Sequence, residues 1–134
     1  MDLKTNKIHK IDLTKEELTL LITLYAKALD YRSKHSILND KAADNLVSSI
    51  DYDFNKLKNF GNSNILAVRA KQYDEWVKEF LETNPDAVVL HLGSGLDTRV
   101  ARLNPPQSVS WFDIDYPNVI KLREKFYSNQ EGYS

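Results

Sequence analysis

The sequence contains no cysteine, which excludes disulfide bonds, thiolate chemistry and cysteine metal sites. It also lacks any run of about 18 apolar residues, the length that a membrane-spanning helix needs, and its first residues lack the apolar core of a signal peptide. The formal net charge of -1 gives no excess of basic side chains for nucleic acid or anionic membranes. These absences predict a cytoplasmic protein that binds small molecules or proteins, and neither nucleic acid nor membranes.

Histidine is also scarce, and its positions do not suggest a metal site. His9, His35 and His91 are scattered, without the HxxxH or HxH spacing of ligand pairs. His91 lies within an apolar run, so we expect a packed, hydrogen-bonded residue of a sheet there. We assign it no catalytic role.

The first 85 residues carry helical patterns. Thr14–Glu17 matches a capping box, and the apolar residues after it predict a helix over about 15–30. Asp40 can cap a second helix, and residues 51–64 resemble a loop with one helical turn. A third helix should end at Asn84-Pro85. Its expected core-facing stripe consists of Leu66, Tyr73, Trp76, Val77, Phe80 and Leu81.

From residue 87 the pattern changes to alternating strands and helices. Strands are predicted at 87–92 and 108–115, with a short helix near 97–103 between them and a last helix from Pro117. The unbroken apolar run of the first strand is typical of a strand buried on both faces of a parallel sheet. The fold class is therefore α/β, with a helical cap over residues 1–85 and an α/β domain beginning in residues 86–134.

Two strands are few for such a sheet. Doubly wound sheets have about five strands or more, and two parallel strands leave both edges unpaired. The sequence therefore predicts the first two strands of a truncated doubly wound sheet, which a further C-terminal portion or another chain, as in a homo-oligomer, would complete.

The most informative stretch is the glycine turn Gly93-Ser94-Gly95, directly after the first strand. Ligands of open α/β sheets bind beyond the carboxyl ends of the strands, where this turn would lie. Asp115 follows Gly93 by 22 residues, close to the spacing at which dinucleotide folds place a carboxylate on ribose hydroxyls. Asp113 lies nearer the strand interior, so Asp115 is the better ribose candidate. The alternative is that Asp115 caps the helix begun by Pro117.

Three further charged residues, Asp97, Arg99 and Arg69, need an interpretation. Asp97 could shape the turn or meet the cationic end of a ligand, whereas Asp97 and Arg99 could instead cap the short helix or form a surface ion pair. Arg69 interrupts an amphipathic helix four residues before Tyr73. From its position alone, Arg69 is more typical of a solvated charge.

The segments Leu92–Arg99 and Trp111–Arg123 together resemble the leucine carboxyl methyltransferase family, including its bacterial polyketide O-methyltransferase-like members. The resemblance extends upstream through Ile50–Phe54 and Val68–Asp74, and covers roughly residues 15–128. Members are class I S-adenosylmethionine-dependent methyltransferases with a helical cap before a Rossmann-like sheet. The expected function is the cofactor-binding N-terminal portion of an O-methyltransferase acting on a carboxyl or hydroxyl of a small molecule.

The resemblance also implies roles for individual residues. Gly93 and Gly95 would let the backbone approach the methionine part of S-adenosylmethionine, and Asp115 would hold its ribose. Arg69 would pair with the carboxylate of the cofactor, since a guanidinium can bind a carboxylate through two hydrogen bonds. Arg32 or Lys34 could assist it. No catalytic residue can be assigned.

Two alternatives remain open at this point. A nicotinamide-dependent oxidoreductase shares the strand, the glycine turn and the acid, although Thr98 occupies the position of its third glycine and some 85 residues precede the first strand. A non-catalytic binding module, such as a truncated paralogue, is favoured by the small number of strands.

Overall fold

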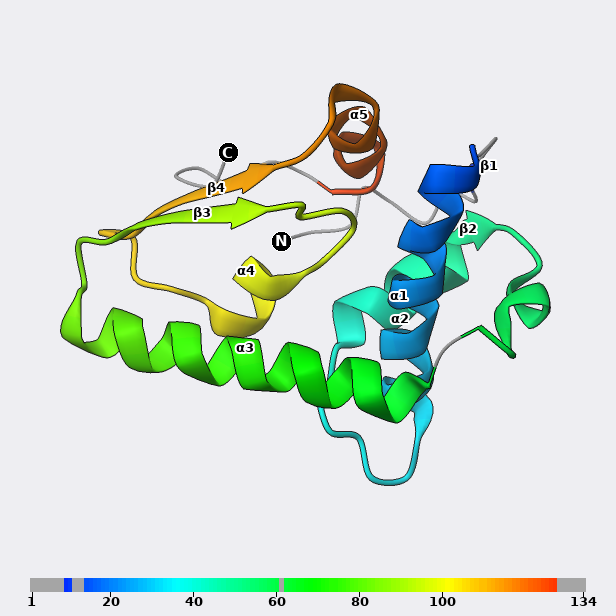
Figure 1. Ribbon diagram of the computed structural model, residues 1–134, viewed down its shortest axis with the longest axis horizontal. Helices are drawn as coiled ribbons and strands as arrows, with labels where there is room; N and C mark the ends of the chain where they lie inside the picture. The colour runs from blue at the N-terminus through cyan, green and yellow to red at the C-terminus, as the bar shows by residue number, and fades with distance from the viewer. Residues whose placement is uncertain (1–8, 11–13, 61, 128–134) are drawn as a thin grey trace. The chain divides into compact units, whose positions relative to one another are not determined.

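A computed structural model describes residues 9–10, 14–60 and 62–127 of the chain (Figure 1). The chain divides into two compact units, one of residues 5–71 and one of residues 72–134 with residues 1–4. The boundary lies within helix α3, Ser63–Thr83, and each unit is described by itself. Among the described residues, no helix is long and apolar enough to cross a membrane.

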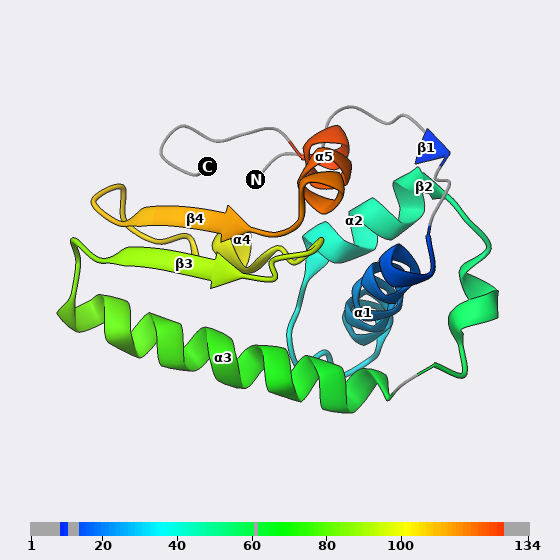
Figure 2. The same cartoon turned by 45° about the horizontal axis from the view of Figure 1, so that its top comes forward.

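The first unit is mainly helical. It begins its described part with strand β1, His9–Lys10, which pairs in parallel with β2, Ile50–Asp51. Between these strands lie α1, Lys15–Arg32, and α2, Lys41–Ser49, which pack against each other (Figure 2). The short helix η1, Phe54–Leu57, follows. The two helices and the single turn after them confirm the sequence prediction, whereas the short strand pair was not expected.

The helix starts of this unit follow local chemistry. Thr14 and Glu17 form the predicted capping box, in which each side chain accepts a hydrogen bond from the backbone N–H of the other residue. The Asp40 side chain accepts the N–H of Ala43 at 3.0 Å and so caps α2. These caps satisfy amide groups that a helix cannot pair internally.

Asp30 organises the connection between α1 and α2. Its buried carboxylate accepts hydrogen bonds from the backbone N–H groups of Ile37 and Leu38, both at 2.9 Å, and from the Ser36 hydroxyl at 2.8 Å. Burial acts to raise the pKa of Asp30, but these hydrogen bonds outweigh it and hold the pKa below its ordinary value. A single carboxylate therefore fixes the path of the loop.

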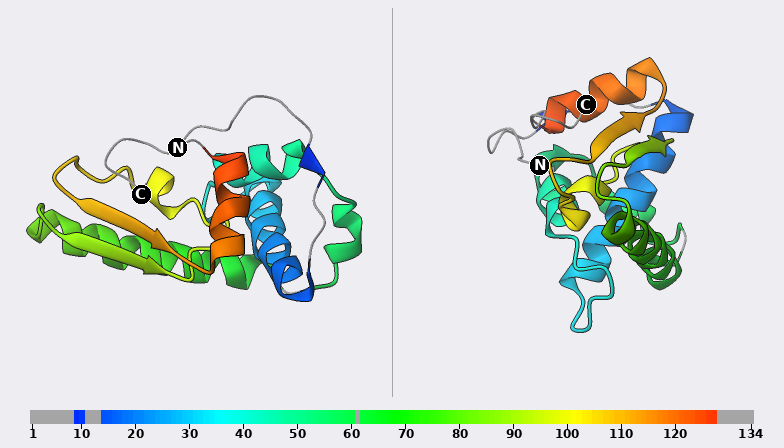
Figure 3. Two further views of the ribbon diagram at one scale, coloured as in Figure 1. Left: turned by 90° about the horizontal axis from the view of Figure 1, so that it is seen from above. Right: turned by 90° about the vertical axis from the view of Figure 1, so that its left-hand side faces the viewer.

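The second unit contains a parallel pair of strands. β3, Val88–Leu92, leads through α4, Arg99–Leu103, to β4, Ser110–Ile114, and α5, Pro117–Phe126, follows. The register pairs Val88 with Ser110 and continues to Leu92 with Ile114, and both views of Figure 3 show the two arrows running in the same direction. This α/β order confirms the predicted first two strands of a Rossmann-like sheet.

The two faces of this sheet differ, and here the sequence prediction was wrong. Both strands expose alternate apolar side chains, with exposed fractions of 39% to 71%. These side chains are Val88, Leu90, Leu92, Phe112 and Ile114. The other face carries Trp111, which is 1% exposed, with Val89, His91 and Asp113 partly buried. The strands are therefore covered on one face, because within the described residues nothing packs fully over the other.

The predicted apolar stripe of α3 was wrong for three of its six residues. Tyr73, Trp76 and Phe80 are 49%, 56% and 55% exposed, although the stripe was expected to face a core. Leu81 is buried as predicted, and the other buried residues of α3 are Ala67, Ala70 and Asp74. Periodicity identified the helix correctly but only part of its buried side, since small side chains carry little hydropathy and can still pack closely.

Candidate functional site

The glycine turn lies where the carboxyl ends of β3 and β4 meet. Gly93 and Gly95 both adopt positive φ, at 64° and 50°, a region that side chains other than glycine rarely occupy. The N–H of Gly93 donates to the carbonyl of Ile114 at 2.8 Å, which ties the turn to the end of β4. The conformation explains the residue type: glycine is needed at both positions.

Gly93 leaves space on one side of the turn. It is exposed, and a Cβ placed on its Cα would meet no atom of the described residues within 4 Å. Steric crowding inside the chain therefore does not require glycine there. An approaching ligand could reach the backbone directly at this position.

Asp115 is joined to this turn. Its Oδ2 accepts the N–H of Gly95 at 2.8 Å, and its Oδ1 accepts the N–H of Tyr116 at 2.7 Å. Tyr116 is the N-cap of α5, and Asp115 precedes it, so the alternative that Asp115 caps the helix from the N-cap position does not hold. A carboxylate offers about four lone-pair positions. Asp115 thus anchors the turn and retains acceptor capacity for a ligand.

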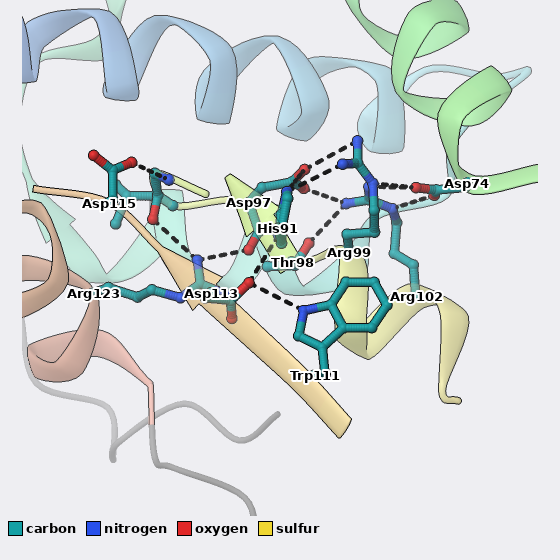
Figure 4. A network of polar contacts seen from close by, with 12 residues as sticks. Asp74, His91, Asp97, Thr98, Arg99, Arg102, Trp111, Asp113, Asp115 and Arg123 are labelled. Carbon is teal, nitrogen blue, oxygen red and sulfur yellow. Dashed lines mark hydrogen bonds and ion pairs between the residues drawn. The ribbon is translucent and has the colours of Figure 1, made fainter. Parts of the chain in front are cut away.

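Asp113 is the centre of a polar network on the covered face of the sheet (Figure 4). Its Oδ1 accepts from His91 Nδ1 at 2.8 Å and from Trp111 Nε1 at 3.2 Å. Its Oδ2 accepts from Arg123 at 2.9 Å. Burial acts to raise the pKa of Asp113, but the His91 hydrogen bond and the Arg123 charge outweigh it and hold the pKa below its ordinary value. Asp113 is therefore ionised and accepts hydrogen bonds from three neighbouring side chains.

The partners of His91 fix its tautomer. Nε2 lies 3.1 Å from an Arg99 guanidinium nitrogen, and a guanidinium can donate but not accept. Nε2 also lies 3.6 Å from a carboxylate oxygen of Asp97. The neutral ring that fits the Arg99 contact carries its proton on Nδ1 and donates it to Asp113. His91 is thus the hydrogen-bonded sheet residue that the sequence predicted.

Asp74 of α3 closes the other end of the network, as Figure 4 shows. It accepts from Arg99 Nε at 2.9 Å and from two nitrogens of Arg102 at 2.7 and 3.0 Å. Arg102 also donates to Asp97 at 2.8 Å and to the Thr98 hydroxyl at 3.1 Å. Thr98, which occupies the position of the third glycine in the nicotinamide-binding pattern, is therefore a buried hydrogen-bond acceptor.

The network explains the position of Asp97. Its carboxylate faces Arg102, and Arg99 lies 3.4 Å away. The Asp97 and Arg99 side chains are 14% and 16% exposed, so their pair is not the surface ion pair considered from sequence. Three carboxylates and three guanidinium groups balance in charge across the network. The geometry favours the interpretation that Asp97 shapes the turn.

Arg69 lies in α3, within the unit of residues 5–71. Its side chain is exposed and makes no ion pair or hydrogen bond with the part of the chain that the structure describes. Arg32 is paired with Asp44 of α2. The structure therefore brings together Gly93, Gly95, Asp97 and Asp115, and describes Arg69 separately from them.

Sequence reasoning missed Asp74, Arg102 and Arg123 as parts of this arrangement. A signal existed for Arg123, because it occupies the apolar face of α5 at helical spacing from Val119 and Phe126. A charge at such a position needs a buried partner. No comparable local signal marks Asp74, whose arginine partners follow it by 25 and 28 residues.

Comparison with known proteins gives consistent matches. The family model "Leucine carboxyl methyltransferase" matches residues 20–131. The chain is 45% identical over 124 residues to the tetracenomycin polyketide synthesis O-methyltransferase TcmP of Streptomyces glaucescens. The aligned segment covers 92% of this chain and 46% of that protein. It is 39% identical over 127 residues to the S-adenosyl-L-methionine-dependent methyltransferase dpfgK of Gibberella zeae, covering 87% and 42%. The chain spans less than half the length of these relatives. No solved structure matches it significantly.

Proposed function

The chain belongs to the leucine carboxyl methyltransferase family, and on that premise we propose that it forms the cofactor-binding portion of an S-adenosylmethionine-dependent O-methyltransferase. The observation that carries this proposal is the hydrogen bond between Asp115 and Gly95 beside the open backbone of Gly93. An acid and a bare glycine backbone lie together at the carboxyl ends of parallel strands. This is where open α/β sheets bind ligands.

The residues present fit such a cofactor. The open space at Gly93 suits close approach of the methionine part to the backbone, and Gly95 holds the turn. Asp115 is already oriented by its two backbone partners and has acceptor capacity for ribose hydroxyls. Arg69, exposed on α3, is the candidate for the carboxylate of the cofactor. Asp97 contributes indirectly, by shaping the turn through Arg102.

The cofactor, when bound, supplies an electrophilic methyl group on a sulfonium. The acceptor that we propose is a carboxyl or hydroxyl oxygen of a small molecule, in keeping with the O-methyltransferase name of one relative. A carboxylate is ionised at neutral pH and needs no general base, whereas an alcohol does. We name no such base, and the role of the described site is to bind and orient the cofactor.

Several further aspects of the proposal rest on the sequence. Residues 1–85 would act as a helical cap and residues 86–134 as the start of the cofactor-binding domain. The composition favours a cytoplasmic location, without nucleic-acid or membrane partners. Assembly as a homo-oligomer, or with a further portion of the enzyme, would complete the two-stranded sheet.

The proposal is tested by titration calorimetry of the 134-residue chain with S-adenosylhomocysteine, beside a parallel titration with NAD. Saturable binding of the first ligand alone is the expected result. Saturable binding of NAD alone would replace the proposal with the oxidoreductase alternative. A chain that binds S-adenosylhomocysteine but gives no methylated product with any acceptor would correspond to the non-catalytic binding module.

A further inference from the structure

Arg123 of α5 contacts the glycine turn, although 28 residues separate it from Gly95 in the sequence. One of its terminal nitrogens donates to the carbonyl oxygens of Gly95 at 3.0 Å and of Asp97 at 2.7 Å. The other donates to Asp113 at 2.9 Å. The guanidinium carbon also lies 5.3 Å from the centroid of the Tyr127 ring. The Arg123 side chain is 7% exposed, so these contacts are made in the interior.

These contacts use three of the five N–H donors of the Arg123 guanidinium. Asp113 supplies the negative charge that makes a buried cation tolerable. The carbonyl groups of the turn accept from the other terminal nitrogen. Tyr127 adds a long contact of 3.4 Å from its hydroxyl to the carbonyl of Leu96. Three consecutive carbonyl groups, those of residues 95, 96 and 97, are thus oriented toward α5 and its end.

This orientation matters because glycine has little conformational preference of its own. The peptide on the N-terminal side of Gly95 is held by Asp115, which accepts the Gly95 N–H. The peptide on its C-terminal side is held by Arg123, which donates to the Gly95 carbonyl. Gly95 is therefore fixed from both sides by charged groups, one at the end of β4 and one on α5.

We infer that Arg123 is a positioning residue for the cofactor: it holds the Gly93–Asp97 turn in its binding conformation without contacting the ligand itself. The inference rests on the proposed function. Arg123 and Asp115 fix the same glycine, and Asp115 is the candidate ribose ligand. Loss of Arg123 should then release the turn and weaken binding through the entropy of reordering it.

The test compares three variants of the 134-residue chain. Arg123→Met removes all three polar contacts at similar volume. Arg123→Lys keeps the charge beside Asp113 but replaces the planar fork with a single ammonium group. Leu122→Ala is the control for stability, because Leu122 is buried on the same helix and its truncation costs stability without removing a side-chain hydrogen bond to the turn.

Two readouts are measured well below the melting temperature of every variant. Hydrogen exchange of the Gly95 and Asp97 amides reports the turn itself, since both amides are hydrogen-bonded in the structure. Calorimetry reports the Kd for S-adenosylhomocysteine. We expect Arg123→Met to speed exchange at both amides and raise Kd by about tenfold or more, Arg123→Lys to give an intermediate effect, and Leu122→Ala to match the wild type in both.

The outcomes distinguish the positioning role of Arg123 from the proposed cofactor-binding function of the chain. Wild-type exchange rates and Kd in both Arg123 variants would overturn the positioning role. Equal changes in Leu122→Ala would also overturn it, because the effect would then follow from lost stability. If the wild-type chain binds no S-adenosylhomocysteine, the proposed function fails, and amide exchange alone decides whether Arg123 holds the turn. If Arg123→Met does not fold, Arg123→Lys decides in the same way.

Discussion

Asp115 and Gly95 are joined by a hydrogen bond of 2.8 Å from the Gly95 N–H to the carboxylate. Asp115 directly follows β4 and Gly95 belongs to the turn after β3, so the contact links the loops that follow two neighbouring parallel strands. The acid is thereby held beside the turn by a contact within the chain itself. Preorganisation of this kind lowers the entropic cost of binding.

The first prediction concerns the charge of Asp115. Asp115→Asn keeps the size of the side chain but removes the charge, and hydrogen bonds to charged groups contribute roughly 1.5–3 kcal/mol. We expect the Kd for S-adenosylhomocysteine to rise about tenfold or more in calorimetry. Asp86→Asn, at an exposed acid before β3, is the matched control. Equal affinities of Asp115→Asn and wild type would remove Asp115 from the site.

A second prediction uses the open space at Gly93. Gly93→Ala places a methyl group where no part of the chain that the structure describes lies within 4 Å, at a φ of 64° that costs an alanine about 1–2 kcal/mol. We expect a modest loss of thermal stability and a much larger loss of S-adenosylhomocysteine affinity. Asn104→Ala is the control, since Asn104 also has positive φ, at 42°, but lies at the end of α4. Similar loss of affinity in both variants would show that strain, rather than ligand contact, is responsible.

Arg69 can be tested by changing the ligand as well as the protein. If Arg69 pairs with the cofactor carboxylate, Arg69→Ala should weaken S-adenosylhomocysteine binding by about tenfold or more. The same variant should bind methylthioadenosine, which lacks that carboxylate, as the wild type does. Lys78→Ala, an exposed cation on the same helix, should change neither affinity. Equal weakening of both ligands would mean that Arg69 acts elsewhere than at the carboxylate.

The fourth prediction concerns acid stability. The pKa of Asp30 in the folded chain lies below its ordinary value of 3.8, so the unfolded chain binds the proton more readily. The stability that Asp30 contributes is therefore fully present above the ordinary carboxyl pKa and is lost as pH falls through the folded value. We expect Asp30→Asn to lower the free energy of unfolding by about 1–3 kcal/mol near neutral pH. The difference between variant and wild type should shrink on acidification.

Urea unfolding at a series of pH values measures this difference directly. Asp51→Asn serves as a control, because Asp51 is an exposed acid of β2 in the same unit. A difference for Asp30→Asn that stays constant down to acid pH would contradict the linkage argument.

The fifth prediction concerns Asp74. Asp74→Asn would remove one of the two carboxylates that Arg99 and Arg102 share and leave Asp97 to balance both guanidinium groups, in a site where Asp74 and Arg102 are 7% and 8% exposed. Breaking a buried ion pair costs about 3–5 kcal/mol. We expect a loss of this size in the free energy of unfolding, against a negligible change in Glu82→Gln on the exposed surface of the same helix. A loss of less than about 1 kcal/mol would place Asp74 among ordinary surface ion pairs.

Local chemistry made much of the fold predictable. The Thr14–Glu17 capping box and the Asp40 cap act within four residues of sequence, so the residue types alone locate the helix starts. The glycine turn was equally local, since positive φ at Gly93 and Gly95 demands glycine. Asp115 was found by a spacing that reflects one strand–helix–strand unit.

The remaining features depend on contacts between distant residues. Arg123 reaches Gly95 across 28 residues, and Arg102 reaches Asp74 across the same number. Hydropathy describes what a side chain prefers, and it cannot show which of two apolar faces is covered. For that reason Trp76 was expected inside and lies 56% exposed, whereas Trp111 is 1% exposed.

Side chains alternate between the two faces of β3 and β4, so the effect of a mutation there depends on whether its residue number is odd or even. The register pairs residues that are 22 apart, so even positions lie beside even positions on both strands. Odd positions hold His91, Trp111 and Asp113 in a charge-balanced network, where loss of Asp113 takes the carboxylate partner from Arg123. Even positions carry exposed apolar side chains whose replacement by polar residues breaks no contact of that network. A mutational scan of the sheet should therefore show tolerance that alternates with residue number, in phase on β3 and β4.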